Sequence, residues 1–270
     1  MKFSVLMSIY HKEKPEHLDR CMRSLWDEQS IRPDEIVLVE DGPLNEALYH
    51  MISHWKEELK DKLVTIALPQ NVGLGKALNK GLEKCRYDLV ARMDTDDIAL
   101  PDRFAIQLKV FESASIDICS SWISEFDQDE TQTLSLRKVP SSHDEIVRFA
   151  KRRNPLNHPA VMYKRSKVFE AGGYQPMLWF EDYYLWVRMI LSGSRFYNIQ
   201  EPLVHMRAGE AQLQRRRGFS YGIQELAFQK KLYSLGFISR SEYLKNVSLR
   251  FSARIVPSSL TKQIYRLLRH

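Results

Sequence analysis

The first hundred residues alternate short apolar runs with longer segments of helical periodicity, and this order limits the folds open to the chain more than any other feature. Apolar runs at 3–9, 36–39, 63–68 and 89–93 have the length and composition of strands buried in a parallel sheet. The segments between them place apolar side chains at intervals of three and four residues. The order predicts an α/β fold whose mostly parallel sheet is flanked by helices and joined by right-handed crossovers.

In the second half of the chain, short motifs predict individual helix and strand boundaries. A strand is expected at 160–163. Ser142 and Glu145 fit a capping box at the start of a helix. Gly172-Gly173 predicts the end of another helix, because glycine adopts the left-handed conformation that closes many helices.

Polar side chains gather where three of the predicted strands end. They are Ser8 and Tyr10 at the first strand, Glu40 and Asp41 at the second, where Gly42 follows, and Asp94, Asp96 and Asp97 at the fourth. Ligands of parallel α/β sheets bind beyond the carboxyl ends of the strands. We therefore expect these side chains to meet at one edge of the sheet.

Asp94-Thr95-Asp96-Asp97 packs three carboxylates into four residues. Their mutual repulsion must be offset by a cation or by hydrogen-bond donors. Oxygen ligands suit Mg²⁺ or Mn²⁺, which bind one or two protein carboxylates together with substrate phosphates. A solvated acidic turn is the alternative for an isolated motif of this kind, but its position at a strand end favours a metal–phosphate site.

A second acidic element is Asp41, which can accept hydrogen bonds from a base imide or a ribose hydroxyl, while Gly42 allows a sharp turn. A simple Asp-Gly turn is the alternative. The loop at 69–75 has neither of the ordinary nucleotide-binding spacings, GxxxxGK[ST] and GxGxxG. We interpret it as leading into a helix N-terminus from which Lys76 or Asn79 would touch a ligand.

Residues 179–186 place Glu181 and Asp182 among five aromatic side chains. An aromatic setting suits sugar stacking and can raise a carboxyl pKa toward that of a working base. A helix N-terminus that favours acidic residues is the alternative, and both can hold. His158 and His205 are further candidates, although a lone histidine is more often structural.

Together these motifs resemble glycosyltransferase family 2, inverting enzymes with the Rossmann-like GT-A fold. The resemblance covers about residues 3–207. It rests on motifs that occur in the expected order: Ser-Ile-Tyr, Glu-Asp-Gly, Asn-Val-Gly-Leu-Gly-Lys-Ala, Asp-Thr-Asp-Asp followed by Leu-Pro-Asp-Arg, Asn-His-Pro-Ala, and Phe-Glu-Asp-Tyr-Tyr-Leu-Trp.

The resemblance implies roles on the donor side. Ser8 and Tyr10 would border the nucleotide, and Asp41 would bind the base, usually uracil. Asp94 and Asp96 would form the DxD element. The metal, Mn²⁺ or Mg²⁺, would bridge the donor diphosphate and bind Asp96 or Asp97. Lys76 is kept among the donor-binding candidates.

On the acceptor side, the resemblance makes Asp182 the general base that deprotonates an acceptor hydroxyl. That oxygen would attack the anomeric carbon from the face opposite the leaving nucleotide. Glu181, His158 and His205 would have acceptor-side or secondary roles. The implied reaction adds a single sugar from a nucleotide-sugar, expected to be a UDP-sugar, to a saccharide or lipid-linked saccharide. Such acceptors are intermediates in exopolysaccharide, O-antigen or capsule biosynthesis.

Two departures from the family pattern matter. The second motif reads Glu-Asp-Gly-Pro where the family often has Asp-Asp-Gly-Ser, so a serine contact is missing. The Gln-x-x-Arg-Trp motif and membrane spans of the processive synthases are absent, which favours single-sugar transfer.

Two alternatives stay open from the sequence. A sugar nucleotidyltransferase also uses a strand-end Asp and Mg²⁺, but it needs a glycine-rich loop after the first strand, where this chain reads Tyr10-His11-Lys12-Glu13-Lys14. An inactive, membrane-associated GT-A-like partner would require at least one missing carboxylate, and the expected ones are present.

Positively charged residues are concentrated in the C-terminal part of the chain. Residues 205–270 carry 13 Lys and Arg against 3 Glu, whereas the net charge of the whole chain is only +6. We predict a catalytic domain at 1–207, with a nucleotide-binding half at 1–100 and an acceptor-binding half at 101–207, and a helical basic extension at 208–270.

Within the extension, residues 250–270 interleave cations with apolar side chains, which suits an anionic membrane surface. Packing against the body is the alternative. No nucleic-acid-binding motif accompanies the basic residues, so nucleic acid is not expected as a partner. Three cysteines without CxxC spacing, and no run of about 20 apolar residues, favour a cytoplasmic protein, with peripheral association with the inner face of the cell membrane as a further option.

Overall fold

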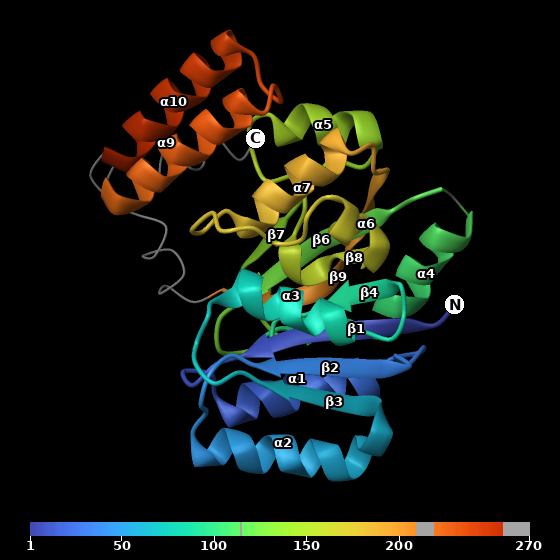
Figure 1. Cartoon of the computed structure of the whole chain (residues 1–270). Helices are drawn as coiled ribbons and strands as arrows, with labels where there is room; N and C mark the ends of the chain where they lie inside the picture. The colour runs from blue at the N-terminus through green and yellow to red at the C-terminus, as the bar shows by residue number, and fades with distance from the viewer. Residues whose placement is uncertain (114, 209–218, 256–270) are drawn as a thin grey trace.

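The computed structural model describes residues 1–113, 115–208 and 219–255 (Figure 1). Its strands are β1 Phe3–Ile9, β2 Glu35–Glu40, β3 Leu63–Ala67, β4 Leu89–Arg92, β5 Ile98–Ala99, β6 Ile118–Phe126, β7 Ser135–Arg137, β8 Met162–Lys164 and β9 Phe196–Arg207. Its α-helices are α1 Pro15–Trp26, α2 Glu46–Leu59, α3 Leu74–Lys84, α4 Arg103–Ser113, α5 His143–Ala150, α6 Arg165–Glu170, α7 Glu181–Leu191, α9 Phe219–Ser234 and α10 Arg240–Ile255.

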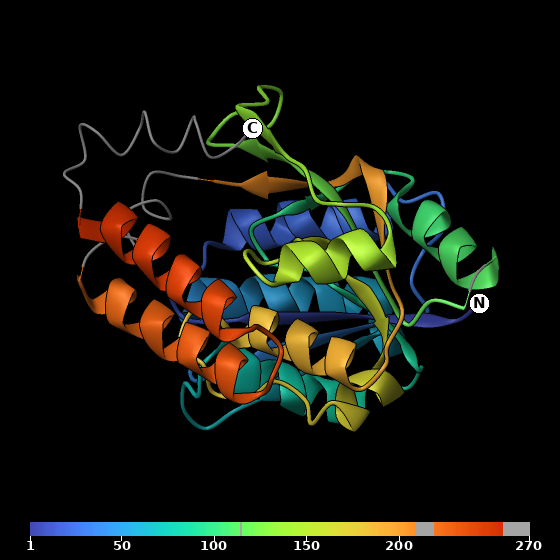
Figure 2. The same cartoon turned by 90° about the horizontal axis from the view of Figure 1, so that it is seen from above.

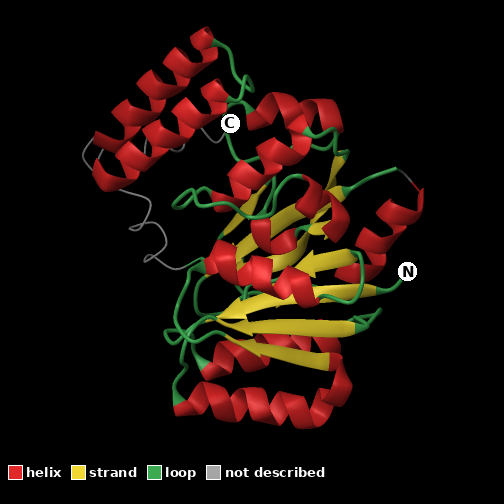
Figure 3. Cartoon of the chain, viewed as in Figure 1, coloured by secondary structure: helices red, strands yellow, loops and turns green. Residues whose placement is uncertain are grey.

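One sheet joins the strands in the order β3-β2-β1-β4-β8-β6-β9-β5, with β7 paired to β6 (Figure 3). The first four strands of this order are parallel, as the alternation of apolar runs and helical segments predicts. Beyond β4 the sheet is mixed, because β8 runs antiparallel to both β4 and β6, whereas β9 runs parallel to β6. The parallel part therefore coincides with the region that the resemblance assigns to the nucleotide.

Several local predictions are confirmed. Ser142 with Glu145 forms the capping box of α5. Gly172 and Gly173 have positive φ and follow α6 directly, which closes that helix.

One strand boundary was wrong. His158–Ala160 forms a 3₁₀ turn, and the strand expected at 160–163 is Met162–Lys164. Pro159 explains the difference, because proline has no backbone N–H to donate to a sheet and suits the first turn of a helix.

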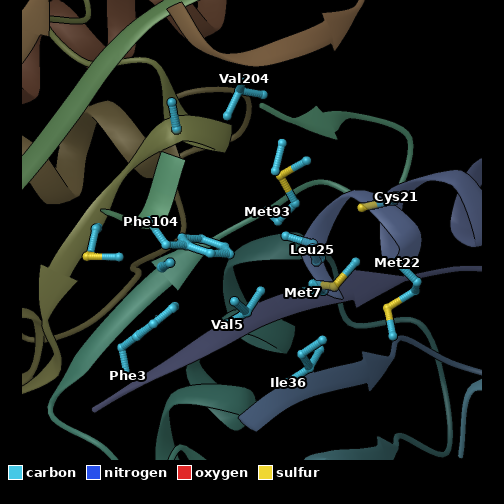
Figure 4. Packing of buried hydrophobic residues seen from close by; sticks show 14 of the residues in the cluster. Phe3, Val5, Met7, Cys21, Met22, Leu25, Ile36, Met93, Phe104 and Val204 are labelled. Atoms are coloured by element: carbon cyan, nitrogen blue, oxygen red, sulfur yellow. The ribbon is translucent and has the colours of Figure 1, made fainter. Parts of the chain in front are cut away.

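Helices cover both faces of the sheet. Alternate residues of β1 face opposite ways, so Phe3, Val5 and Met7 pack with residues of α1, α2 and α4, while Leu6 packs with residues of α3 and α7. Figure 4 shows part of the first core, where Phe3 and Val5 lie near Phe104. This double covering explains why β1 and β2 are buried along almost their whole length and are mostly apolar.

α7 is buried on two sides. Leu185 and Trp186 belong to the core against the sheet, whereas Tyr183, Tyr184 and Val187 pack with α9. The pair α9 and α10 lies side by side beyond α7 (Figures 1 and 2). The described part of the basic extension therefore packs on the body of the protein.

Hydrogen bonds also tie α10 to the end of α5. Asn246 donates from its side chain to the carbonyl of Lys151 (2.8 Å), and Lys151 pairs with Glu242 (3.1 Å). None of the described helices is both long and apolar enough to cross a membrane. The segment 250–270 that we expect to contact a membrane lies, beyond Ile255, outside the described residues.

Candidate active site

The carboxyl ends of β1 and β2 lie next to each other. Ile9 pairs with Glu40, and the backbone N–H of Asp41 donates to the carbonyl of Ile9 at 2.7 Å. Ser8 is half-buried one register position earlier, and Tyr10 is exposed one position later. The structure thus brings Ser8, Tyr10 and Asp41 to the same edge of the sheet.

The carboxylate of Asp41 is buried and holds the loop that precedes α3. It accepts hydrogen bonds from the backbone N–H groups of Val72 (2.7 Å) and Gly73 (3.1 Å). Gly42, with φ of +88°, lets the chain pass close to Asn71, because a Cβ at this position would lie 2.6 Å from the Asn71 nitrogen. Asp41 therefore has a structural contact that the sequence did not predict. A carboxylate has lone pairs left for a further donor.

The start of α3 contacts the start of α7. A Cβ added at Gly75 would lie 3.4 Å from Cβ of Tyr174 and 3.5 Å from Cγ of Glu181, which is ordinary van der Waals distance, so the two segments are close neighbours here. Asn79 accepts from the backbone N–H of Tyr174 (2.8 Å) and donates to its carbonyl (2.7 Å). Lys76 is exposed in the first turn of α3. Asn79 thus binds the protein itself, while Lys76 points to solvent at the site edge.

The acidic motif after β4 has one exposed and one fully buried carboxylate. Asp94 is 36% exposed and accepts a hydrogen bond from Arg92. Asp97 is 2% exposed, and its Oδ1 accepts from the backbone N–H of Arg207 at 2.8 Å. Burial, with the nearby charges of Asp94 and then Glu13, raises the pKa of Asp96 to about 7.

Glu13 is a member of the cluster that the sequence analysis missed. Its Oε2 accepts from the hydroxyl of Thr95 at 3.1 Å, and its Oε1 lies 3.2 Å from Nδ1 of His17. The available signal was its position four residues after β1, at the same edge as the other strand ends. The structure therefore adds a fourth carboxylate beside the acidic motif.

Two buried arginines lie behind these carboxylates. Arg92 is 1% exposed and Arg103 is fully buried, and Nη2 of Arg103 donates to the carbonyl of Arg92 at 2.6 Å. Burial would lower the pKa of Arg92, but the charge of Asp94 and its hydrogen bond raise it overall. A buried cation next to a carboxylate offsets part of the repulsion within the motif. Arg92 interrupts the apolar run at 89–93, and this position in the sequence could have predicted a buried cation next to the acidic motif.

The acidic motif fits a divalent cation that also binds substrate phosphates. Oδ2 of Asp97 is buried without a hydrogen-bond partner, and burial followed by the charges of Asp96 and Asp94 raises the pKa of Asp97. The charge of Arg92 offsets this only in part, so the motif has room for a further positive charge. Among the described residues, no three His, Cys, Asp or Glu side chains converge as a complete metal site. Mg²⁺ and Mn²⁺ commonly use one or two protein carboxylates with phosphate oxygens, which matches this arrangement.

Glu181 and Asp182 occupy the first turn of α7. Nδ2 of Asn154 donates to Oδ2 of Asp182 at 2.6 Å. Burial, and to a smaller degree the charge of Asp182, raises the pKa of Glu181. Asn154 comes from the segment after α5, so no local pattern around Asp182 could have predicted its contact.

Tyr174 lies between the two acidic regions. The charges of both Asp182 and Asp94 act on its hydroxyl, and burial is the largest cause of its raised pKa. Nε2 of His158 lies 3.0 Å from that hydroxyl. Burial, with a contribution from Arg92, lowers the pKa of His158, so this ring is neutral at physiological pH. The Tyr174 hydroxyl is thus close enough to both acidic regions for their charges to act on its pKa.

His205 belongs to β9, beside β5, and its backbone pairs with Ile98. Its Nδ1 lies 2.7 Å from the hydroxyl of Ser124, its Nε2 lies 2.8 Å from the carbonyl of Glu130, and its ring stacks on Phe126. Both ring nitrogens are thus within hydrogen-bond distance of protein atoms. This geometry supports a packing role next to the acidic motif.

Known proteins that are similar to this chain in sequence are glycosyltransferases. The model of the family described as "Glycosyl transferase family 2" matches residues 4–219. An uncharacterized glycosyltransferase of Haemophilus influenzae is 42% identical over 98% of both chains, and the amylovoran biosynthesis glycosyltransferase AmsE of Erwinia amylovora is 40% identical over 97% of both. The UDP-Gal:alpha-D-GlcNAc-diphosphoundecaprenol beta-1,3-galactosyltransferase of Escherichia coli is 37% identical over 98% of this chain and 95% of its own.

Solved structures resemble the chain in fold. Residues 1–349 of S. aureus TarS in complex with UDP-GlcNAc superpose with a TM-score of 0.68 and 16% identity, over 94% of this chain and 72% of that one. The mannosyltransferase PcManGT from Pyrobaculum calidifontis in complex with GDP-Man and Mn²⁺ gives 0.63 and 14%, over 92% and 68%. The chain spans 44% of the longer TarS structure. These neighbours have the predicted GT-A type of α/β fold.

Proposed function

The chain belongs to glycosyl transferase family 2, and from this membership we propose a specific reaction for it. We propose that it transfers one sugar from a UDP-sugar to a lipid-linked saccharide, with inversion at the anomeric carbon and with the help of Mn²⁺ or Mg²⁺. The product would be an intermediate in the biosynthesis of a bacterial surface polysaccharide, and the Erwinia amylovora relative, named for amylovoran biosynthesis, supports a biosynthetic role of this kind.

One observation carries this proposal: three acidic elements from distant parts of the chain lie near one another through a short series of neighbouring residues. Asp41 holds the loop before α3, and Gly75 in the next turn lies against Glu181. The charges of Asp94 and Asp182 both reach the hydroxyl of Tyr174. A diphosphate and a base-activated hydroxyl can therefore be held within one region.

On the donor side, the edge formed by Ser8, Tyr10 and Asp41 would take the nucleoside, and Asp94 with Asp96 would face the ribose and diphosphate. Asp96 and Asp97 would hold the divalent cation, which supplies positive charge against the departing diphosphate. The UDP part of the proposal is supported by the Escherichia coli relative, whose name specifies UDP-Gal. Lys76, exposed at the start of α3, would contact the donor phosphates.

On the acceptor side, Asp182 would take the proton of the attacking hydroxyl, and Asn154 would hold the carboxylate in position. The new bond joins the acceptor oxygen to the anomeric carbon, while the bond from that carbon to the diphosphate oxygen breaks and the nucleoside diphosphate leaves. General base catalysis of this kind contributes roughly 100- to 10,000-fold.

The decisive experiment uses the full-length chain with UDP-Gal, Mn²⁺ and a synthetic GlcNAc-α-diphospho-lipid, the acceptor type named for the Escherichia coli relative. We expect a disaccharide lipid with a β linkage by NMR, and inhibition by EDTA. Asp182→Asn should lower transfer roughly 1,000-fold, and Asp96→Asn should abolish metal-dependent donor hydrolysis.

The matched control is Asp61→Asn, an exposed carboxylate in the 3₁₀ turn Lys60–Lys62 before β3, at the opposite end of the strands. It should keep full activity. An α-linked product would contradict inversion. If no nucleotide-sugar is bound or hydrolysed, with any common base or sugar, the transferase assignment to this site is wrong.

We also propose that the protein works at the inner face of the cell membrane, where a lipid-linked acceptor resides, through the cations and apolar residues of 250–270. Flotation with anionic and with neutral vesicles tests this directly. Full-length protein should float with anionic vesicles, whereas a chain ending at Ile255 should float less. Equal flotation of the two would contradict a membrane role for the tail.

A further inference from the structure

Of the five aromatic residues around Glu181 and Asp182, the structure leaves one exposed. The other four, Phe180, Tyr183, Tyr184 and Trp186, are at most 6% exposed and belong to the hydrophobic core. Trp179 is 41% exposed. An aromatic ring that can stack on a sugar must be accessible, so Trp179 is the member of this group able to do so.

The backbone of Trp179 is held in an unfavourable conformation. Its φ is +68°, in the left-handed region, where only Lys60 joins it among the described non-glycine residues. A bulky side chain in this region costs about 1–3 kcal/mol and persists where surrounding contacts enforce it, often at functional sites. The next residue, Phe180, donates its backbone N–H to the carbonyl of Met177 at 2.7 Å, which closes the turn before α7.

The indole is also fixed in orientation by the C-terminal helices. It stacks on the ring of Tyr221 in α9, with 5.1 Å between centroids and 21° between planes. Tyr221 is 7% exposed and packs in turn on Phe180, with 5.4 Å between centroids. One face of the indole is thus supported from behind, and its direction is set before any ligand arrives.

The position of this ring connects it to the acceptor. Trp179 precedes Glu181 by two residues and Asp182 by three, and its backbone N–H contributes to the stabilisation of the Glu181 carboxylate. The donor-side groups come instead from β1, β2, β4 and α3. A sugar whose hydroxyl gives its proton to Asp182 would therefore come close to the segment that carries Trp179. Pyranose rings present C–H groups on one face, and these pack well on the flat face of an indole.

We propose that Trp179, supported by Tyr221, binds the acceptor by stacking on its terminal N-acetylhexosamine ring, so that the C-terminal helices shape acceptor recognition. This proposal rests on the proposed function. It makes Trp179 an acceptor-binding residue and Tyr221 a positioning residue.

The test compares Trp179→Ala, Trp179→Leu and Trp179→Phe with the wild type, using UDP-Gal and the GlcNAc-α-diphospho-lipid. The Ala and Leu variants should raise the acceptor KM roughly three- to tenfold, the range expected for the loss of one aromatic stacking contact. The donor KM and the slow hydrolysis of UDP-Gal without acceptor should stay unchanged. Trp179→Phe keeps a flat ring and should recover most of the acceptor affinity.

Leu178→Ala is the matched control, because Leu178 is the exposed apolar neighbour at 52% and has no ring. It should leave the acceptor KM unchanged. Tyr221→Leu should raise the acceptor KM with little effect on the donor KM.

An unchanged acceptor KM in Trp179→Ala would overturn the proposal, and so would equal increases in the KM of donor and acceptor. If the wild type hydrolyses UDP-Gal but does not transfer to this lipid, the acceptor class named here is wrong while the transferase function stands. Absence of both hydrolysis and donor binding would instead refute the proposed function.

Discussion

The side-chain amide of Asn154 donates a hydrogen bond to the carboxylate of Asp182, with 2.6 Å between Nδ2 and Oδ2. Asn154 lies beyond the end of α5, and Asp182 lies in the first turn of α7. The contact joins two segments 28 residues apart and fixes the orientation of the carboxylate that we propose as the general base.

The first prediction concerns this contact. Asn154→Ala should lower kcat about tenfold, since one hydrogen bond to a charged group is worth roughly 1.5–3 kcal/mol and only part of it acts on orientation. The donor KM should not change. Asn154→Asp should be worse, because it places a second negative charge against Asp182. Steady-state kinetics of the three proteins check the order, and wild-type kcat in Asn154→Ala would contradict the assigned role.

The second prediction concerns Asp41. In Asp41→Asn an amide group replaces a carboxylate oxygen that accepts from Val72 or Gly73, so one buried N–H loses its acceptor. We expect a loss of about 1–3 kcal/mol in the free energy of unfolding. The donor KM should also rise, because the loop before α3 is released. Urea unfolding and donor titration measure both effects, with Asp61→Asn as the unaffected control.

The third prediction follows from the lowered pKa of His158, which burial causes with help from Arg92. The folded protein keeps this ring neutral below pH 6.5, whereas the unfolded chain takes up a proton there. The stability contributed by the neutral ring is therefore present above pH 6.5 and is lost as the pH falls toward the lower folded-state pKa. The slope is at most about 1.4 kcal/mol per pH unit for one proton.

His158→Gln removes that titration. Its free energy of unfolding should fall less steeply between pH 6.5 and pH 5 than that of the wild type, even if the variant is less stable at pH 7. Denaturant titrations at several pH values give the two slopes. Identical slopes would show that His158 is accessible to protons in the folded state.

The fourth prediction concerns thiol chemistry. Cys21, Cys85 and Cys119 are buried, and burial raises the pKa of Cys85 and of Cys119 to about 12. Thiolates are the reactive form, so the folded protein should not react with a disulfide reagent at pH 8. All three thiols should react once the chain is unfolded in guanidinium chloride. Rapid labelling of the native protein would show that one of these sites opens.

The fifth prediction tests the packing of α9 on α7. Phe228 is fully buried and stacks on Phe180, with 4.8 Å between ring centroids. Phe228→Ala should cost about 3–5 kcal/mol and should lower transfer, because α7 carries Asp182. Leu244→Ala on α10, where the side chain is 55% exposed, should change stability by less than about 0.5 kcal/mol. Equal stability of the two variants would contradict this packing.

The elements that the sequence predicted well are those with local causes. The strands β1 to β4 follow from apolar runs between helical segments, and the capping box of α5 follows from Ser142 and Glu145. The antiparallel pairing of β8 with β4 and β6 depends on contacts between distant segments, which no local pattern records. Family membership now favours the glycosyltransferase interpretation over a nucleotidyltransferase.

The same distinction applies to the candidate site. The acidic motif after β4 and the pair Glu181-Asp182 stand out locally because several charges fall within a few residues. Glu13, Asn154 and Tyr174 were missed because their contacts to the site span distant parts of the chain. His205 was identified by residue type alone, and only the surrounding atoms reveal its packing contacts.

Because α7 is covered on its outer side by α9, translation imposes an order on the maturation of this protein. The ribosome completes Asp182 well before it completes Phe228, Leu232 and Phe237. The apolar outer side of α7 therefore stays exposed on a nascent chain until α9 has left the ribosome. Exposed apolar surface of this kind is bound by chaperones during synthesis. A chain that stops before α9 should therefore expose apolar side chains of α7 and aggregate more readily than the full-length chain.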